Sequence, residues 1–332
     1  MQRRRAWLTL LLLAAPVLGC GGPFPQTTLA PRSDVGWAIQ DLFTTVFWWA
    51  VAVFVIVEGL LLYTVVRYRR RPQAPPPAHH HGHTGLEIAW TLAPAVILVF
   101  IAIPTTLTIF RTSGRAVAGA LRVEVIGHQW WWEFRYPDLG VVTANELRVP
   151  VGRPVALDLT SADVIHSFWV PGLGGKRDLT QGRTTRLTFT ADSTGTYRGQ
   201  CAEFCGVSHA NMRVRLQVDS APAFDAWVAR QLGGVVPAAR GSPEERGLEV
   251  YRRSACVACH TVAGVSAARI GPDLSHVGSR TTIGSGLLAN TPEQLARWIR
   301  DAPAVKPGVL MPPMPLPDED LAAIVAFLRS LQ

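Results

Sequence analysis

Two long apolar runs near the amino terminus constrain this chain more than any other feature. They cover about residues 44–66 and 88–110, and each is long enough for a helix to cross a hydrocarbon core of roughly 30 Å. Arg67 and Arg69–Arg71 lie between them, followed by a stretch rich in proline and histidine. Because cytoplasmic loops are enriched in Lys and Arg, the sequence predicts a transmembrane hairpin with a cytoplasmic connection. Everything after about residue 111 is then expected outside.

A shorter apolar segment precedes the hairpin. Three arginines within the first five residues lead into an apolar run over 6–18, which is too short to span a bilayer and is typical of a signal peptide. The following Val17-Leu18-Gly19-Cys20 resembles a bacterial lipobox. The sequence therefore predicts a signal peptide over 1–19 and a lipidated Cys20 on the outer face. An ordinary signal peptide with an incidental cysteine is the alternative.

The cysteines are few and unevenly placed. Five occur in 332 residues: Cys20, then Cys201 with Cys205, then Cys256 with Cys259. This number is too small for a disulfide scaffold, and the two tight pairs point to cofactor chemistry. The net charge is +8, but the basic residues form short patches without a long basic face, so no nucleic-acid partner is expected.

Residues 121–220 change from a helical to a two-residue period. Val155, Leu157 and Leu159 alternate with polar neighbours, as do Val214 and Leu216. Runs in which apolar and polar residues alternate, separated by turn residues, predict a half-exposed antiparallel sheet in a sandwich or small barrel.

A cluster of metal-binding residue types closes this region. Cys201, Cys205, His209 and Met212 lie within twelve residues, and His166 precedes them by about 35. Sulfur and imidazole ligands select copper, zinc or iron. Structural zinc rarely uses a thioether, and a single blue-copper site needs only one cysteine. The set suits two coppers bridged by both sulfurs; a surface disulfide is the alternative.

The run from Cys201 to Met212, with Asp163-Val164-Ile165-His166-Ser167 upstream, resembles the dinuclear copper A site of subunit II of haem-copper cytochrome c oxidases. The resemblance covers about residues 37–220 and implies a cupredoxin-like domain. It also implies the ligand set: Cys201 and Cys205 as bridges, with His166, His209, Met212 and the backbone carbonyl of Glu203. The Glu203 side chain is further expected to reach a Mg²⁺ ion at the interface with subunit I.

Two further segments match this family. Gly127 to Trp132 resembles the aromatic patch through which electrons enter copper A, with Trp131 where the family usually has Tyr. Trp130 is the expected entry residue, and packing of a Trp-rich strand is the alternative. Leu86 to Thr91 resembles the start of the second transmembrane helix. That resemblance implies that Glu87 lies at the entrance of a proton channel feeding subunit I.

The last third of the chain carries a second cofactor motif. A short helix and a Gly/Pro/Ala-rich linker are expected over 221–241, followed by a helical domain over 242–332. Cys256-Val257-Ala258-Cys259-His260 has the spacing of a c-type haem attachment site. The cysteines would form thioethers and His260 would bind the iron.

Residues 242–332 resemble class I cytochrome c, an all-α domain. Gly271-Pro272-Asp273-Leu274 matches the loop that supports the proximal histidine, and 306–312 resembles the loop with the distal methionine. This implies Met311 as the sixth iron ligand, with Met314 as the alternative.

The sequence thus predicts a multidomain membrane protein similar to subunit II of a caa-type cytochrome c oxidase with its own haem c. Its expected partners are subunits I and III, membrane lipid, and an external cytochrome c or bc-type complex. Its expected location is the bacterial cytoplasmic membrane, with both metal domains outside. A copper A-type nitric oxide reductase subunit, or a copper-binding redox protein or chaperone outside any oxidase, is the alternative.

Overall fold

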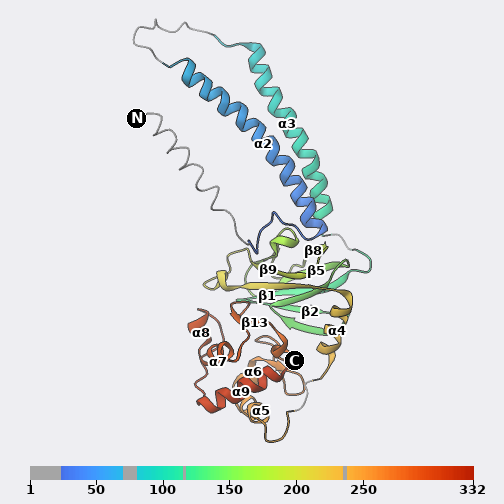
Figure 1. The fold of residues 1–332 in the computed structure, drawn as a ribbon, viewed down its shortest axis with the longest axis vertical. Coiled ribbons are helices and arrows are strands. Elements are labelled where there is room, and N and C mark those ends of the chain that lie inside the picture. The colour runs from blue at the N-terminus through green and yellow to red at the C-terminus, as the bar shows by residue number, and fades with distance from the viewer. Residues whose placement is uncertain (1–23, 70–80, 115–116, 235–237) are drawn as a thin grey trace, which may run out of the picture.

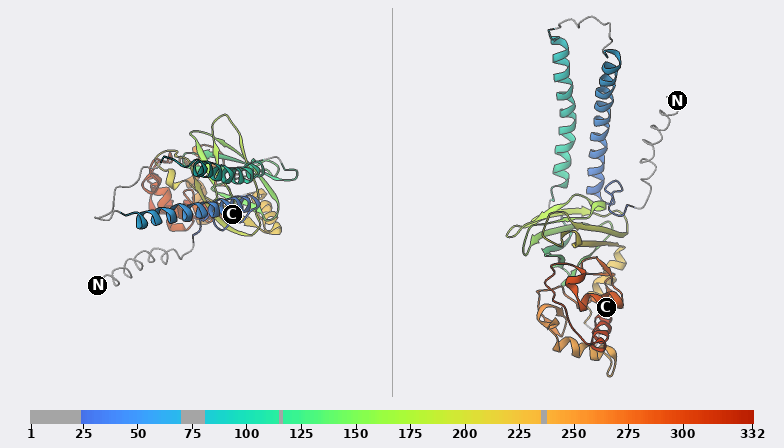
Figure 2. Two further views of the ribbon diagram at one scale, coloured as in Figure 1. Left: turned by 90° about the horizontal axis from the view of Figure 1, so that it is seen from above. Right: turned by 90° about the vertical axis from the view of Figure 1, so that its left-hand side faces the viewer.

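A computed structural model describes residues 24–69, 81–114, 117–234 and 238–332. The predicted signal peptide (1–19) and Cys20 lie outside the described residues. The described chain forms three tiers along one axis (Figures 1 and 2). A pair of long helices is followed by a β-sheet tier, called here the β domain (121–219), and then by the helical domain (243–332).

The long helices are α2 (Asp34–Arg67) and α3 (Thr84–Thr112), which lie side by side (Figure 2). Both are apolar and long enough to cross a membrane, and most of their apolar side chains are exposed, as expected of membrane spans. They extend beyond the predicted 44–66 and 88–110 because each begins with a polar cap. Ser33 Oγ accepts from Gly36 N, and His83 Nδ1 accepts from Leu86 N.

The first turn of α2 is attached to the β domain by hydrogen bonds. Ser33 Oγ donates to the Leu173 carbonyl at 2.7 Å, and Asp34 accepts from the backbone N–H of Thr190, also at 2.7 Å. One turn later, Trp37 Nε1 donates to Asp192. These contacts fix the orientation of the β domain relative to the membrane hairpin.

The β domain contains two five-stranded sheets, with strand orders β3-β2-β1-β5-β8 and β4-β10-β9-β6-β7. The strands of the first sheet are β1 (Leu121–His128), β2 (Trp131–Tyr136), β3 (Val141–Ala144), β5 (Pro154–Ser161) and β8 (Thr185–Thr190). Those of the second are β4 (Glu146–Pro150), β6 (His166–Trp169), β7 (Arg177–Leu179), β9 (Gly195–Cys201) and β10 (Arg213–Asp219).

The expectation of a purely antiparallel sheet is wrong in both sheets. β1 pairs with β5 in parallel, and β10 pairs with β4 in parallel. A two-residue period reports which face of a strand is buried, not the direction of its neighbour, so it did not predict these pairs. The predicted inward side chains Val155, Leu157 and Leu159 are fully buried.

Aromatic side chains fill the space between the sheets. Trp132 and Phe168 are at most 1% exposed, and their rings meet edge-to-face at 5.3 Å, a favourable geometry. Helix α4 (Ala221–Leu232) covers one end of the domain, where Trp227 packs against Tyr136. The core thus holds β6, β9 and β10, which carry the cysteine–histidine cluster, in a fixed arrangement.

The helical domain has its own hydrophobic core. Its helices are α5 (Pro243–Arg253), α6 (Cys256–Cys259), α7 (Pro292–Arg300), α8 (Ala302–Val305) and α9 (Asp318–Ser330), and its short strands are β11 (Thr261–Val262), β12 (Ser266–Ala267), β13 (Thr282–Ile283) and β14 (Leu288–Ala289). Ser242 and Thr291 cap α5 and α7, because their hydroxyls accept from the backbone N–H of Glu245 and Gln294. Helices α5 and α9 pack together opposite the β domain (Figure 1).

Candidate functional site

The predicted metal cluster lies where β6, β9 and β10 end in the second sheet. His166 opens β6, Cys201 closes β9, and Met212 directly precedes β10. The intervening loop carries Cys205 and the short 3-10 turn η2 (His209–Asn211). Pairing of β9 with both β6 and β10 therefore brings residues 35 positions apart in sequence to one place.

The two thiols occupy the centre of the cluster. Cys201 Sγ lies 3.8 Å from Cys205 Sγ and 3.9 Å from His166 Nδ1. Cys205 Sγ lies 3.6 Å from His209 Nδ1 and 3.9 Å from Met212 Sδ. The other three predicted side-chain ligands thus lie around the two sulfurs, and this soft donor set fits copper.

The sixth predicted donor is a main-chain oxygen. The Glu203 carbonyl lies 3.2 Å from Cys201 Sγ, while the Glu203 side chain is exposed. The neighbouring Phe204 is 76% exposed. The loop therefore turns its carbonyl toward the sulfurs and its side chains away from the domain.

Hydrogen bonds prepare two of the donors for a metal. Asp163 Oδ1 lies 2.7 Å from His166 Nε2, which leaves Nδ1 directed at the thiols, an arrangement common for metal-binding histidines. The hydrogen bond with Cys205 and that with His166 lower the pKa of Cys201 below the ordinary value of a thiol. A thiolate is the form that binds a metal.

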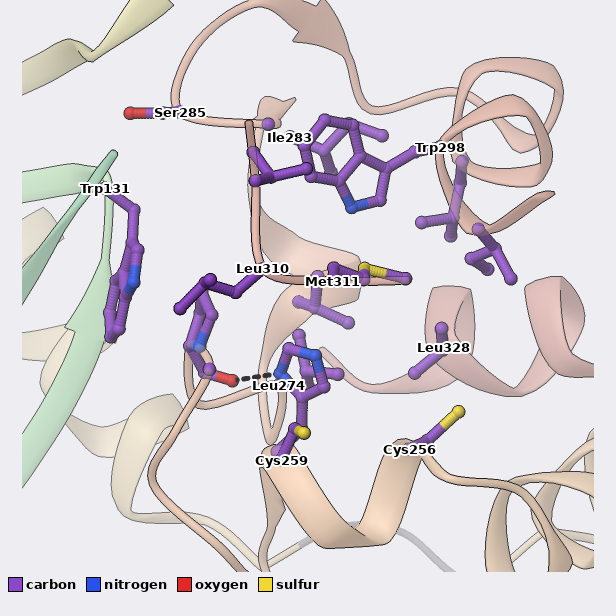
Figure 3. Close-up of a pocket in the computed structure, with 18 of the residues that line it drawn as sticks. Trp131, Cys256, Cys259, Leu274, Ile283, Ser285, Trp298, Leu310, Met311 and Leu328 are labelled. Atoms are coloured by element: carbon purple, nitrogen blue, oxygen red, sulfur yellow. Dashed lines mark hydrogen bonds between the residues drawn. The ribbon is translucent and has the colours of Figure 1, made fainter. Parts of the chain in front are cut away.

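The second site is a cavity in the helical domain. Cys256 and Cys259 stand one turn apart on α6 at its edge (Figure 3). His260 Nδ1 lies 2.8 Å from the Pro272 carbonyl, so the N–H is held there and Nε2 has no hydrogen bond to any described residue. Burial lowers the pKa of His260 and thereby favours the neutral imidazole that an iron requires.

Further features of the cavity fit a haem. A Cβ on Gly271 would lie 2.5 Å from His260 Cε1, so only glycine permits the ring position. Arg280 lies on the cavity wall with its Nη2 on the Asp273 carbonyl. Burial lowers the pKa of this guanidinium. No carboxylate among the described residues forms an ion pair with it, and the anionic edge of a haem would supply one.

Both candidate methionines line the cavity but differ in their surroundings. Met314 packs against the hydrophobic core of the helical domain, and its N–H donates to the Arg300 carbonyl. Met311 lines the cavity and projects into it on the side of Trp298 (Figure 3). This arrangement favours Met311 as the iron ligand.

The β domain closes one side of the same cavity. Gln129, Trp130, Trp131 and Asn145 form this wall. Trp130 is 7% exposed, and its Nε1 donates to the Cys205 carbonyl at 3.0 Å. Trp131 stacks on His128 with ring centroids 4.1 Å apart. The predicted entry residue therefore touches both the cavity and the loop between β9 and β10 (202–212), called here the metal loop.

The remaining predicted residue is distant from both sites. Glu87 is exposed in the first turn of α3, at the end of the hairpin away from the β domain (Figure 1). Sequence reasoning missed Lys306, which is 2% exposed between the two domains. Its signal was its rarity: only two of the 32 basic residues, Lys176 and Lys306, are lysines.

Curated relatives match this chain over nearly its full length. The chain is 35% identical over 333 residues to cytochrome c oxidase subunit 2 of Alkalihalophilus pseudofirmus, which covers 98% of this chain and 96% of that protein. The chain belongs to the cytochrome c oxidase subunit 2 family. The Bacillus subtilis member is 34% identical over 351 residues, with 98% of each chain covered.

Three family models divide the chain in the same order. They are the transmembrane domain of cytochrome c oxidase subunit II over 32–108, its periplasmic domain over 141–219, and cytochrome c over 244–332. The structure of the periplasmic domain of subunit II from Bradyrhizobium japonicum is 32% identical, with 35% of this chain and 96% of that chain covered and a TM-score of 0.34.

The predicted resemblance and fold class are confirmed. This is an oxidase subunit II with a fused cytochrome c domain, and its domains imply copper A and haem c. Membership also implies a complex with subunit I and a cytochrome c donor.

Proposed function

We propose that this chain passes electrons from its cytochrome c domain to its copper A domain and on to the oxygen-reducing site of subunit I in a proton-pumping oxidase. The observation that supports this route is the position of Trp130. This indole lines the cavity of the helical domain and donates a hydrogen bond to the carbonyl of Cys205. A single side chain thus links the two sites.

The donor sets determine which group each domain would hold. Cys201, Cys205, His166, His209, Met212 and the Glu203 carbonyl would hold two coppers; Cys256, Cys259, His260 and Met311 would hold one haem c. When bound, both groups undergo one-electron oxidation and reduction, and the chain's own residues fix their surroundings. His/Met ligation raises the reduction potential of a haem, so the axial pair would set the potential of this electron carrier.

Rapid mixing of the purified oxidase with a reduced cytochrome c tests this order. The c-type haem is expected to become reduced first, at a rate that rises with donor concentration. Copper A should follow at a rate independent of donor concentration, because that transfer occurs within one chain. Reduction of copper A before the haem would contradict the proposal.

The contacts beyond this chain are part of the proposal. The exposed side chain of Glu203 lies on the outer side of the metal loop, where it could reach a Mg²⁺ ion shared with subunit I. Metal analysis of a Glu203→Gln oxidase should show lost Mg²⁺ and retained copper. Unchanged Mg²⁺ would exclude Glu203 as a ligand.

We further propose that this chain contacts subunit III and lipid. Its proposed location is the bacterial cytoplasmic membrane, with a lipidated Cys20.

Glu87 is proposed to collect protons for subunit I. Its exposed position at the loop end of α3 is consistent with contact to water. Replacing it with glutamine is expected to slow steady-state oxygen reduction, by less than the roughly 100-fold typical of a group that transfers the reacting proton itself. Unchanged oxygen consumption by the assembled enzyme would refute this role.

Met311 is proposed as the distal iron ligand. Met311→Ala should therefore abolish the sulfur-to-iron absorption band of the oxidised haem, while Met314→Ala should leave it. Absorption spectra of the two variants in the assembled oxidase decide between them. Loss of the band in Met314→Ala alone would reverse the assignment.

A further inference from the structure

The loop that leads to Met311 is also in contact with the β domain. Lys306 is 2% exposed, and its Nζ donates to the Trp130 carbonyl at 2.6 Å and to the Gly284 carbonyl at 3.2 Å. The first carbonyl belongs to the proposed entry residue, and the second belongs to the helical domain itself. One amine therefore joins the two domains at the tryptophan.

The two residues after Lys306 continue this contact. The Pro307 carbonyl accepts from Ser208 Oγ at 2.5 Å. Gly308 has φ +83°, and a Cβ there would lie 2.8 Å from Trp130 Cη2 and closer still to Val207. Glycine is thus required both by the backbone conformation and by the close approach. The Lys-Pro-Gly segment (306–308) rests on the entry tryptophan and on the metal loop.

A second contact holds the same face of the helical domain. Glu146, in β4, accepts hydrogen bonds from the backbone N–H and the hydroxyl of both Thr281 and Thr282, at 2.6–3.1 Å. Next to it, Ser285 and Arg213 exchange hydrogen bonds through the serine side chain and both backbones. The two contacts prevent the helical domain from rotating about the Lys-Pro-Gly segment.

Lysine suits this buried position. Its compact ammonium presents several donors without the planar fork of arginine, and the chain otherwise uses arginine almost throughout. Burial lowers the pKa of Lys306 to about 7. Both the ammonium and the neutral amine keep the two N–H donors that the two carbonyls need, so the bonds persist in either form.

We propose that the Lys-Pro-Gly segment is the docking element that seats the helical domain on Trp130, and that Lys306 is a positioning residue for electron transfer between the two domains. This inference rests on the proposed electron route. Electron tunnelling falls steeply with distance, so release of the segment would slow transfer without changing either metal site. Because no ion pair between described residues makes the contact, ionic strength should have little influence on it.

Two measurements on the full-length chain in the assembled oxidase test the proposal. The first follows electron transfer from the haem to copper A after a light pulse excites a soluble reductant, which reduces the haem and is itself oxidised by one electron. The second follows amide hydrogen exchange at residues 129–131 and 205–208, which needs no turnover. Lys306→Met keeps an unbranched apolar side chain but loses the N–H donors of the amine. Lys176→Met, at an exposed lysine of the β domain, is the matched control.

Lys306→Met is expected to slow the transfer at least tenfold, to make it sensitive to viscosity, and to speed exchange at both segments. Haem and copper spectra should be retained, and Lys176→Met should match the wild type. If Lys306→Met fails to take up haem, Glu146→Ala on the other domain replaces it, with the same expected changes.

Unchanged transfer and exchange in both Lys306→Met and Glu146→Ala would overturn the docking role. Absence of haem-to-copper transfer in the wild type would instead overturn the proposed electron route and the positioning role with it. Faster exchange in Lys306→Met would, in that case, still support docking.

Discussion

Replacing Cys205 with serine is expected to abolish the dicopper centre while the haem is retained. Its sulfur lies within 3.9 Å of the Cys201 sulfur, the His209 nitrogen and the Met212 sulfur. A hydroxyl cannot replace a bridging thiolate for a soft metal. Loss of an outer-shell partner already costs a metal site about 10–100-fold in affinity, so loss of this ligand should cost more.

Copper analysis, the mixed-valence electron paramagnetic resonance signal and the haem absorption spectrum together measure this result. Cys256→Ser is the reciprocal control, since it removes one predicted thioether and should leave the copper signal intact. Survival of the mixed-valence signal in Cys205→Ser would mean that the sulfur pair does not bridge the metals.

The second large effect is expected at Trp130. Trp130→Leu removes both the indole ring on the cavity wall and the N–H donated to the Cys205 carbonyl. We expect haem-to-copper electron transfer to slow roughly 10- to 100-fold, the scale on which small losses of alignment act in positioned reactions. The light-pulse experiment described for Lys306 measures this rate directly.

Trp131→Leu is the matched control for this prediction. Trp131 lines the same wall and stacks on His128, but it makes no hydrogen bond to the metal loop. A smaller decrease is therefore expected. A larger decrease in Trp131→Leu than in Trp130→Leu would transfer the entry role to the neighbouring indole.

The metal donors were predictable because their patterns are local. Cys201 to Met212 and Cys256 to His260 each place several ligands within a few turns of chain, and such spacing restricts the chemistry before any fold is known. The apolar runs were equally informative, because a membrane span needs a fixed length of helix. His83 was different: its role as the cap of α3 depends on a backbone angle that composition does not reveal.

The contacts between domains were not predictable in the same way. The pairing of β4 with β10 joins strands about 70 residues apart, and Lys306 meets Trp130 across 176 positions. Such contacts depend on the complete fold and leave no periodic signal in the sequence. In the sequence the Lys-Pro-Gly segment resembles only a methionine loop, because its contacts with Trp130 and Ser208 depend on the folded chain.

Main-chain acceptors form part of the junction between the β domain and the helical domain. Lys306 binds two carbonyls, Ser208 binds the carbonyl of Pro307, and Arg213 takes part through its backbone. Side-chain replacements at Trp130 or Pro307 leave these acceptors in place. Paired substitutions are therefore unnecessary at these two positions during divergence, whereas Glu146 and Gly308 depend on the side chains that they face across the junction.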